Sequence, residues 1–370
     1  MKLLYVIEHI STVGGLERIL VAKLNALAAE PGHEVVLMTV WRDGAPPAFP
    51  LDSRVGRVCL GVRRPVSALG MMVSMPRVIA RFNRMVREIS PDITVHFRAV
   101  GAMLAAFSKR HGHIVFETHS ARQHCNHRWL YPLMERRSDA VVCLTGADAG
   151  NYSRASRVEV IPNFTDMKPV VPAGQRDYGA RRCVYSGRLC AEKNPLRLLR
   201  LWKNIQASHP DWTLDMYGTG ELESEVMAEM EALGIGGSVT MHGNVADMAA
   251  AYSHGSILLL TSRTEGFPMT VIEAMRCGLP VVSFDCPYGP AEIIRDGVNG
   301  FLVPQTDDAA FVHCVSSLMD NEALRQRMGM QAASDSSGYS ADAVIGKWKT
   351  FFREVAADGR PCRCPEGRSP

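Results

Sequence analysis

Two acidic side chains, Glu265 and Glu273, stand eight residues apart in the stretch from Ile257 to Asp285. Glu265 belongs to a polar, glycine-bearing loop, and Glu273 to a segment whose apolar residues recur at helical spacing. The apolar runs on either side of this loop and helix are typical of buried strands. A strand–loop–helix–strand unit binds ligands beyond the carboxyl ends of its strands, where the start of the helix offers N–H groups and a positive dipole end. The pattern therefore predicts an anion site, with phosphate as the natural candidate.

Two cations earlier in the chain suit the same chemistry. Arg188 and Lys193 lie five residues apart, after an expected strand at Arg182–Gly187, and Pro195 suits the first turn of a following helix. Two cations above a helix N-terminus can stabilise a departing diphosphate. Ordinary surface charge is the alternative reading.

The run EGFPMTVIE, followed by AMRCGLPVVSFD, closely resembles the nucleotide-binding signature of glycosyltransferase family 4, a retaining family with the GT-B fold. GGLERIL, GR-x4-K-N, IPNFTD and HGNV resemble further motifs of that family. DCPYGPAEII-x4-NGFLVP resembles the subset that builds bacterial capsule, lipopolysaccharide and related glycans. The resemblance implies retaining transfer of a hexose or N-acetylhexosamine from a nucleotide-diphosphate sugar, with UDP expected. The acceptor would be a sugar hydroxyl of a lipid-linked glycan or polysaccharide, and neither metal nor cofactor is expected.

The resemblance also assigns roles to residues. It places Glu265 against the donor sugar, Glu273 on the ribose hydroxyls, and Arg188 and Lys193 on the leaving diphosphate. His119, at the end of an expected strand, matches a residue that contacts the transferred sugar, although a histidine satisfied by a backbone carbonyl would look the same. The remaining expected donor-binding residues are glycines and loop residues: Gly15, Gly187, Gly218, Gly243, Gly266, Phe267, Pro268, Met269 and Thr270.

Strands alternate with helices along the 370 residues, which predicts an α/β protein with two doubly wound parallel sheets of Rossmann type, facing a cleft as in the GT-B fold. We expect an N-terminal acceptor-binding domain at residues 1–166, a linker at 167–179 and a nucleotide-sugar-binding domain at 180–340. A helix at 341–357 would return to the first domain, and a Pro/Gly/Arg-rich tail at 358–370 would be disordered.

Charge is distributed unevenly. Residues 1–165 hold 21 Lys+Arg against 13 Asp+Glu, a net +8, whereas the remainder holds 20 against 25, a net −5. The segment Met71–Ile89 reads as an amphipathic helix with Arg77, Arg81 and Arg84 on its polar side. Such a helix could bind an anionic membrane surface, or could be a core helix with a charged outer face.

The cysteine content and the N-terminal residues indicate the cellular compartment. The ten cysteines are scattered, so a disulfide framework is not expected and a reducing cytoplasm fits. The N-terminal apolar run is interrupted by Glu8 and His9 and is better read as a strand than as a signal peptide. We therefore expect a cytoplasmic protein, at the inner face of the membrane if the basic helix binds lipid.

Several alternatives remain open. A nucleotide-sugar 2-epimerase shares the GT-B architecture, and a non-catalytic nucleotide-sugar sensor would bind the donor without turnover. A nicotinamide oxidoreductase is disfavoured because the first strand lacks the full glycine fingerprint. Nucleic-acid binding is disfavoured because the basic patch lacks interleaved aromatic residues. One histidine cluster matches no zinc pattern: His111, His113, His119, His124 and His127.

Overall fold

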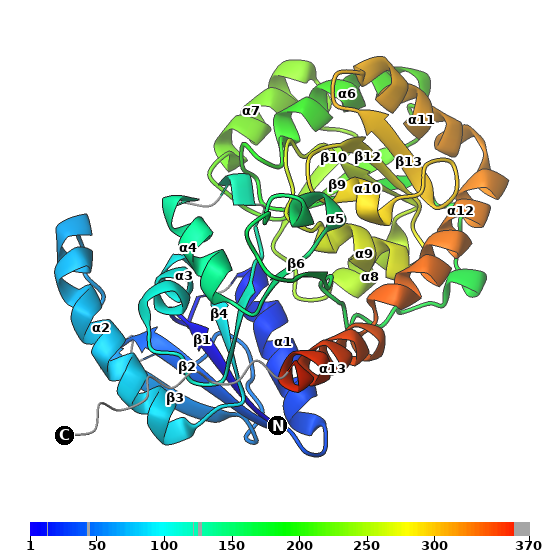
Figure 1. The fold of residues 1–370 in the computed structure, drawn as a ribbon. Helices are drawn as coiled ribbons and strands as arrows, with labels where there is room; N and C mark the ends of the chain where they lie inside the picture. The colour runs from blue at the N-terminus through cyan, green and yellow to red at the C-terminus, as the bar shows by residue number, and fades with distance from the viewer. Residues whose placement is uncertain (13, 43–44, 121, 125–127, 359–370) are drawn as a thin grey trace, which may run out of the picture. The chain divides into compact units, whose positions relative to one another are not determined.

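The computed structural model describes residues 1–12, 14–42, 45–120, 122–124 and 128–358. Contacts divide the chain into two compact units: residues 1–162 with the segment from Val344 onward, and Asn163–Ala343. Of the expected disordered tail, all but Asp358 lies outside the described residues, as does His127 of the histidine cluster. Each unit is a parallel sheet with helices on both faces (Figure 1). The fold is therefore the predicted pair of Rossmann-like domains.

The sheet of the first unit has seven parallel strands in the order β3-β2-β1-β4-β5-β6-β7. The order reverses between β1 and β4, where Leu3 lies beside Ile93. The strands are β1 Lys2–Ile7, β2 Glu34–Trp41, β3 Gly56–Val62, β4 Ile93–Phe97, β5 His113–Glu117, β6 Ala140–Cys143 and β7 Val158–Val160.

Helices cover both faces of this sheet because its strands are apolar on both sides. On one face α2 (Ala68–Ile89) and α3 (Arg98–Phe107) pack against Val6 and Met38 through residues such as Phe82. On the other face α1 (Gly15–Ala29) lies beside the last helix, α13 (Ala341–Ala357), to which the Glu30–Lys349 ion pair joins it (Figure 1). Two short helices, α4 (Tyr131–Arg137) and α5 (Gly146–Ala149), precede β6 and β7.

The sheet of the second unit has six parallel strands in the order β10-β9-β8-β11-β12-β13, and this order reverses between β8 and β11. Its strands are β8 Arg182–Ser186, β9 Thr213–Tyr217, β10 Val239–Gly243, β11 Ile257–Leu260, β12 Val281–Asp285 and β13 Gly300–Pro304. Both sheets thus have the same winding, with a switch point near the middle of each.

Two layers of helices cover the second sheet as well. The main core gathers Trp202 of α6 (Pro195–Ser208), Val226 of α7 (Glu223–Leu233) and Phe311 of α11 (Asp308–Asp320) against the strands. The opposite layer holds α8 (Met248–His254), α9 (Met269–Arg276) and α10 (Pro290–Ile293), and α12 (Glu322–Asp335) follows α11 (Figure 1).

The Pro/Gly-bearing stretch at residues 167–179 belongs to the second unit. Its Arg176 is buried and donates to the carbonyl oxygens of Cys277 (2.9 Å), Tyr252 (2.7 Å) and Gly255. Carbonyls at the ends of helices lack helical partners, so one guanidinium fastens this stretch to the ends of both α8 and α9.

None of the helices that the structure describes is long and apolar enough to cross a bilayer. The longest, α2, spans 22 residues with Pro76 inside it, and its outer surface is rich in arginine.

Candidate functional site

The two loops singled out by the sequence meet at the switch point of the second sheet. Strands β8 and β11 are neighbours, with Cys183 beside Ile257 and Val184 beside Leu258. The loop after β8 covers residues 187–194 and leads into α6, while the loop after β11 covers residues 261–268 and leads into α9. In doubly wound sheets ligands bind at this point, because the loops on either side diverge and leave a crevice.

Lys193 and Glu265 form an ion pair at this point. The Lys193 Nζ donates to both carboxylate oxygens of Glu265, at 2.6 and 2.7 Å, and the Ser262 Oγ donates to Oε1 at 2.6 Å. The Glu265 side chain is 5% exposed, whereas that of Lys193 is 24% exposed. The carboxylate is therefore held rigidly, and its cation stays accessible from solvent.

The loop that carries Lys193 is anchored from the neighbouring strand. Thr261 Oγ1, just after β11, donates to the carbonyl oxygens of Asn194 (3.1 Å) and Lys193 (3.3 Å). Asn194 adopts a left-handed conformation with φ 54°, which asparagine tolerates better than most residues, and α6 starts at Pro195. These contacts fix the backbone position from which the Lys193 side chain extends.

A third segment supports Glu265 from behind. Gly289, in the loop after β12, lies so close that a Cβ there would approach Pro268 Cδ to 2.7 Å and Glu265 Cβ to 3.2 Å. The Glu265 N–H donates to the Pro287 carbonyl at 3.4 Å. Burial raises the pKa of the adjacent Cys286 thiol to about 12, so this thiol stays neutral.

The predicted residues 266–270 form the end of the loop and the first turn of α9. Helix α9 begins at Met269. In its first turn the Val271 N–H donates to the Pro268 carbonyl at 3.0 Å, and the N–H groups before it lie outside the regular helical bonding pattern. Phe267 is buried with its ring 5.8 Å from that of Tyr339, which steadies the turn. Glu273 lies in the second turn and is buried.

Three predicted glycines line the carboxyl ends of adjacent strands. The Gly187 N–H donates to the Tyr217 carbonyl at 3.0 Å, and the Gly218 N–H donates to the Gly243 carbonyl at 2.8 Å. Gly218 has φ +126°, and a Cβ there would lie 2.0 Å from the Gly187 carbonyl oxygen. Only glycine fits at position 218, and the result is a backbone-lined edge beside the Lys193 loop.

Arg188 lies on the same loop, and its side chain is exposed. Its carbonyl accepts a hydrogen bond of 3.1 Å from the buried Tyr185 hydroxyl, which fixes the backbone below the guanidinium. The two predicted cations therefore differ: Lys193 is held by a carboxylate, and Arg188 projects into solvent.

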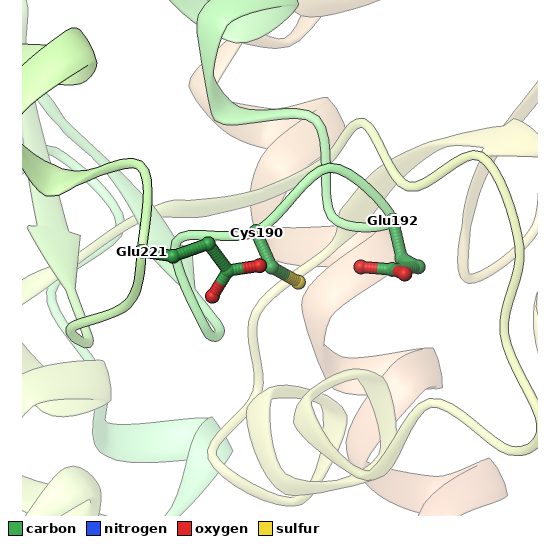
Figure 2. A group of neighbouring side chains, drawn as sticks. All are labelled: Cys190, Glu192 and Glu221. Carbon is green, nitrogen blue, oxygen red and sulfur yellow. The ribbon is translucent and has the colours of Figure 1, made fainter.

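One group of side chains beside this loop has the composition of a metal site. Cys190, Glu192 and Glu221 place ligand atoms within 4.8 Å of one another, and they come from the loops that follow β8 and β9 (Figure 2). Burial raises the pKa of the Cys190 thiol, and its hydrogen bond with the Glu192 carboxylate acts in the same direction. A cysteine binds a metal ion as its thiolate, and the raised pKa keeps Cys190 a thiol. A hydrogen bond between the Cys190 thiol and the Glu192 carboxylate therefore explains their contact more simply than a metal ion does.

The first unit holds a separate cavity of about 270 Å³ at the carboxyl ends of β4 and β5. His119 lines it, and its Nε2 lies 2.8 Å from Glu117 Oε1. The apolar wall includes Leu16, Phe97 and Tyr131. Among the described histidines, His111, His113 and His119 take part in no group with metal-ligand spacing.

Gly15 is the first residue of α1 and follows Gly14, whose Cβ, if it had one, would lie 2.4 Å from Glu17 Oε2. The same Glu17 accepts a hydrogen bond of 2.9 Å from Arg98 Nη2 at Oε1. Arg98 has φ 55°, a conformation that is uncommon for a residue with a side chain. The glycine loop therefore packs around an ion pair at the rim of the His119 cavity.

The two halves of the chain match two family models. Residues 13–168 match the model described as Glycosyltransferase Family 4, and residues 173–335 match the model described as Glycosyl transferases group 1. The chain belongs to glycosyltransferase family 4. This family 4 glycosyltransferase carries Arg188, Lys193 and Glu265 on the two loops at the β8–β11 switch point.

Relatives of this glycosyltransferase act in bacterial glycan biosynthesis. It is 28% identical to the amylovoran biosynthesis glycosyltransferase AmsD of Erwinia amylovora, over 95% of this chain and 99% of that one. It is 24% identical, over 96% and 99%, to a Campylobacter jejuni α-1,4-N-acetyl-D-galactosaminyltransferase named for an undecaprenol-diphosphate-linked acceptor. Among solved structures, sucrose-phosphate synthase of Thermosynechococcus elongatus superposes with a TM-score of 0.79 at 16% identity, over 96% and 98%. The fold is GT-B, and the protein is a glycosyltransferase of glycan biosynthesis.

Proposed function

We propose that this glycosyltransferase moves a hexose or N-acetylhexosamine from a UDP-sugar to a hydroxyl of a lipid-linked or polysaccharide acceptor, with retention of configuration. The main observation in support is the buried Glu265 carboxylate, which accepts two hydrogen bonds from Lys193 at the switch point of the second sheet. The Campylobacter relative named for an undecaprenol-linked acceptor supports the choice of a lipid-linked substrate.

In the proposed reaction, different residues stabilise the negative and the positive charge that develop during transfer. Transfer builds negative charge on the departing diphosphate and positive charge on the sugar ring. Lys193, Arg188 and the N–H groups at the start of α9 meet the diphosphate, and Glu265 faces the sugar. Glu273 takes the ribose hydroxyls. Ser262 keeps Glu265 aligned while Lys193 turns part of its charge toward phosphate oxygens.

Donor identity is tested first. UDP-glucose, UDP-galactose, UDP-N-acetylglucosamine, UDP-N-acetylgalactosamine and GDP-mannose are compared by thermal shift on the full chain, because a ligand at 100 times its Kd stabilises the folded state by about 2.7 kcal/mol. One UDP-sugar should stand out. Stabilisation by GDP-mannose alone would refute the UDP donor.

Transfer and stereochemistry are tested next. The selected donor is incubated with synthetic undecaprenyl-diphosphate-linked oligosaccharides, and the new anomeric proton is read by NMR. An α linkage from an α-configured donor is expected, and a β linkage would refute retention. Appearance of the 2-epimer in a reaction without acceptor would identify an epimerase instead, and tight binding without turnover would identify a sensor.

We also propose that α2 brings the protein to an anionic membrane surface, where a lipid-linked acceptor resides. Leu69, Met72 and Val73 are 71%, 74% and 65% exposed on the first turns of the helix. The same helical face continues through the exposed Arg77 and Arg84. Apolar side chains flanked by cations suit an interface of acyl chains and anionic headgroups.

Vesicle flotation tests this membrane proposal. Binding to phosphatidylglycerol vesicles should exceed binding to phosphatidylcholine vesicles, and it should fall about tenfold or more when Leu69, Met72 and Val73 are all replaced by Ser. Met330→Ser, which removes an exposed methionine from α12, serves as the control and should bind as the wild type does. Equal binding of the triple variant would refute the role of α2.

Transfer without a metal ion is part of the same proposal, since the cationic side chains and amides assigned to the diphosphate would stabilise its negative charge. Activity should be unchanged by EDTA and by added Mg²⁺ or Mn²⁺. If EDTA abolished activity and Cys190→Ser lowered the affinity for the restoring metal, the group of Cys190, Glu192 and Glu221 would be a metal site after all.

A further inference from the structure

A lysine and a glutamate in the first unit form an ion pair that the proposed chemistry does not use. Lys23, in α1, and Glu117, the last residue of β5, are each 2% exposed. The Lys23 ammonium donates to both oxygens of the Glu117 carboxylate, with a distance of 2.5 Å to Oε2. The two residues lie 94 positions apart in the sequence, so only the fold brings them together.

Three aromatic rings enclose the remaining side of the ammonium. The Lys23 Nζ lies 4.1 Å from the ring centroid of Trp348 in α13, 5.3 Å from that of Tyr5 and 5.5 Å from that of Phe97. Ring faces attract a cation, so the rings partly replace the water that the ammonium has lost. Burial still lowers the pKa of Lys23, and the Glu117 carboxylate opposes that shift.

Glu117 has a second partner, the imidazole of His119, whose Nε2 lies 2.8 Å from Oε1. Burial alone would raise the pKa of Glu117, but the Lys23 charge and the His119 hydrogen bond outweigh it and hold the pKa below its usual value. An ionised carboxylate can only accept hydrogen bonds. Nε2 must therefore carry a hydrogen, and in the neutral form of an imidazole the lone pair is then on Nδ1.

Stability does not by itself account for such a pair. Moving two charges out of water costs several kcal/mol per ion, and apolar replacements of similar volume are often neutral or stabilising. A carboxylate hydrogen-bonded to one nitrogen of an imidazole, in contrast, fixes which tautomer and which ring orientation the histidine adopts. The His119 side chain is 10% exposed and lines the cavity at the ends of β4 and β5.

We propose that Glu117, held in place by Lys23, is a positioning residue that keeps His119 in the Nε2–H tautomer. Nδ1 is thereby presented to the cavity as a hydrogen-bond acceptor for a hydroxyl of the sugar substrate. An acceptor nitrogen selects a hydroxyl over a carbonyl or an ionised phosphate oxygen, neither of which has a hydrogen to donate. This inference rests on the proposed function for the identity of the substrate, and on the contacts alone for the tautomer.

The experiment compares the wild type with the double variant Lys23→Met/Glu117→Gln. This variant leaves no unpaired charge in the interior, because methionine fills the space among the rings and glutamine replaces the carboxylate without changing its shape. Glutamine can donate as well as accept, so it no longer dictates the tautomer. The ring nitrogens of His119 are read by ¹H–¹⁵N NMR of the full chain without substrate at pH ~8, where an ordinary imidazole is neutral. The signals are assigned by their loss in His119→Gln.

The wild type should show His119 with hydrogen on Nε2, and the double variant should show a substantial shift toward the Nδ1–H form. With the donor and acceptor found above, kcat of the double variant should fall about 10- to 100-fold, by analogy with the loss of a carboxylate that orients a metal-bound histidine, with a smaller change in KM. An unchanged tautomer would overturn the proposal. So would a changed tautomer with unchanged transfer, because the hydrogen bond to substrate would then not matter.

A control separates positioning from general loss of packing. Glu135, in α4 of the same unit, is fully buried, pairs with Arg122 and makes no contact with His119 among the described interactions. Glu135→Gln should lower the thermal midpoint but leave the His119 tautomer unchanged. If the wild type transferred no sugar at all, the proposed function would have failed, while the NMR comparison would still decide the Glu117–His119 assignment.

Discussion

Lys193 and Glu265 act on each other before any ligand arrives, so their roles are coupled. The resemblance assigns the lysine to the diphosphate and the acid to the sugar, whereas the structure shows three hydrogen bonds that converge on Glu265. A carboxylate fixed in this way can face a developing positive charge without reorganising, which is the condition for large electrostatic stabilisation of a transition state.

Removal of either partner should therefore abolish most of the activity. We expect Lys193→Ala and Glu265→Gln each to lower kcat about 100- to 1,000-fold, and the double variant to lose less than the product of the two effects, because the residues act as a unit. Arg200→Ala, which breaks the exposed pair with Glu229, is the matched control and should keep full activity. Single-turnover kinetics measure the loss, and full activity of either single variant would contradict the site.

The buried His96 should make the stability of the folded state depend on pH. It is 1% exposed in β4, and burial lowers its pKa to about 3. The unfolded state takes up this proton near pH ~6.5 and the folded state does not, so stability is complete above that pH and falls as pH drops toward about 3. At pH 5 the loss amounts to about 2 kcal/mol.

Replacement of the imidazole should remove this loss. Urea unfolding of His96→Leu at pH 7.5 and pH 5 should show about 2 kcal/mol less acid destabilisation than the wild type, whatever its stability at pH 7.5. An identical pH dependence in both proteins would show that His96 is protonated in the folded state.

At the scale of elements, the loops after β8 and β9 approach closely at Gly218 and Gly220. Gly218→Ala would place a methyl group 2.0 Å from the Gly187 carbonyl oxygen, so the Lys193 loop would have to move. Displacing catalytic groups by about 1 Å can cost about 100-fold, and we expect a loss of this size in kcat/KM. Gly236→Ala, where a Cβ meets nothing within 4 Å, should change little, and equal loss in both variants would point to general destabilisation.

Much of this arrangement could be predicted from sequence because it is local. Alternating apolar runs give the strands, and the glycines and prolines mark the loops that carry Arg188, Lys193 and Glu265. The assignments of these residues to parts of the donor remain predictions. The pairing of Lys193 with Glu265 was not predicted, because the spacing of residues in the sequence does not show which rotamers long side chains adopt.

The sequence also did not predict contacts between segments that lie far apart along the chain. Neither Lys23 nor Glu117 belongs to a motif, and their pairing appears only once α1 and β5 are packed on the same sheet. Gly289 was recognised as part of DCPYGP, yet its close contact with Pro268 and Glu265 depends on how the loops after β11 and β12 pack. Ser262, three residues before Glu265, was the one missed residue with a local signal, as a hydroxyl within reach of the acid.

At the scale of the molecule, each unit has its own core, and most of the residues predicted to bind the donor lie in the second unit. Unfolding should therefore show two calorimetric transitions. The UDP-sugar selected above should raise the transition of the second unit, by an amount equivalent to about 2.7 kcal/mol at 100 times Kd, and should leave the other nearly unmoved. A single transition that shifts as a whole would show that the two cores unfold together.

Helix α13 is the last element that the structure describes and follows the whole second unit, yet its Trp348, Phe351 and Phe352 are buried in the core of the first unit. Domains usually fold in the order in which they leave the ribosome. Here the face of the first sheet on which α1 lies is not fully covered until α13 has emerged. We therefore expect the nascent chain to complete its second domain before its first, so that ribosome stalling ahead of Trp348 would leave the N-terminal half open to chaperones.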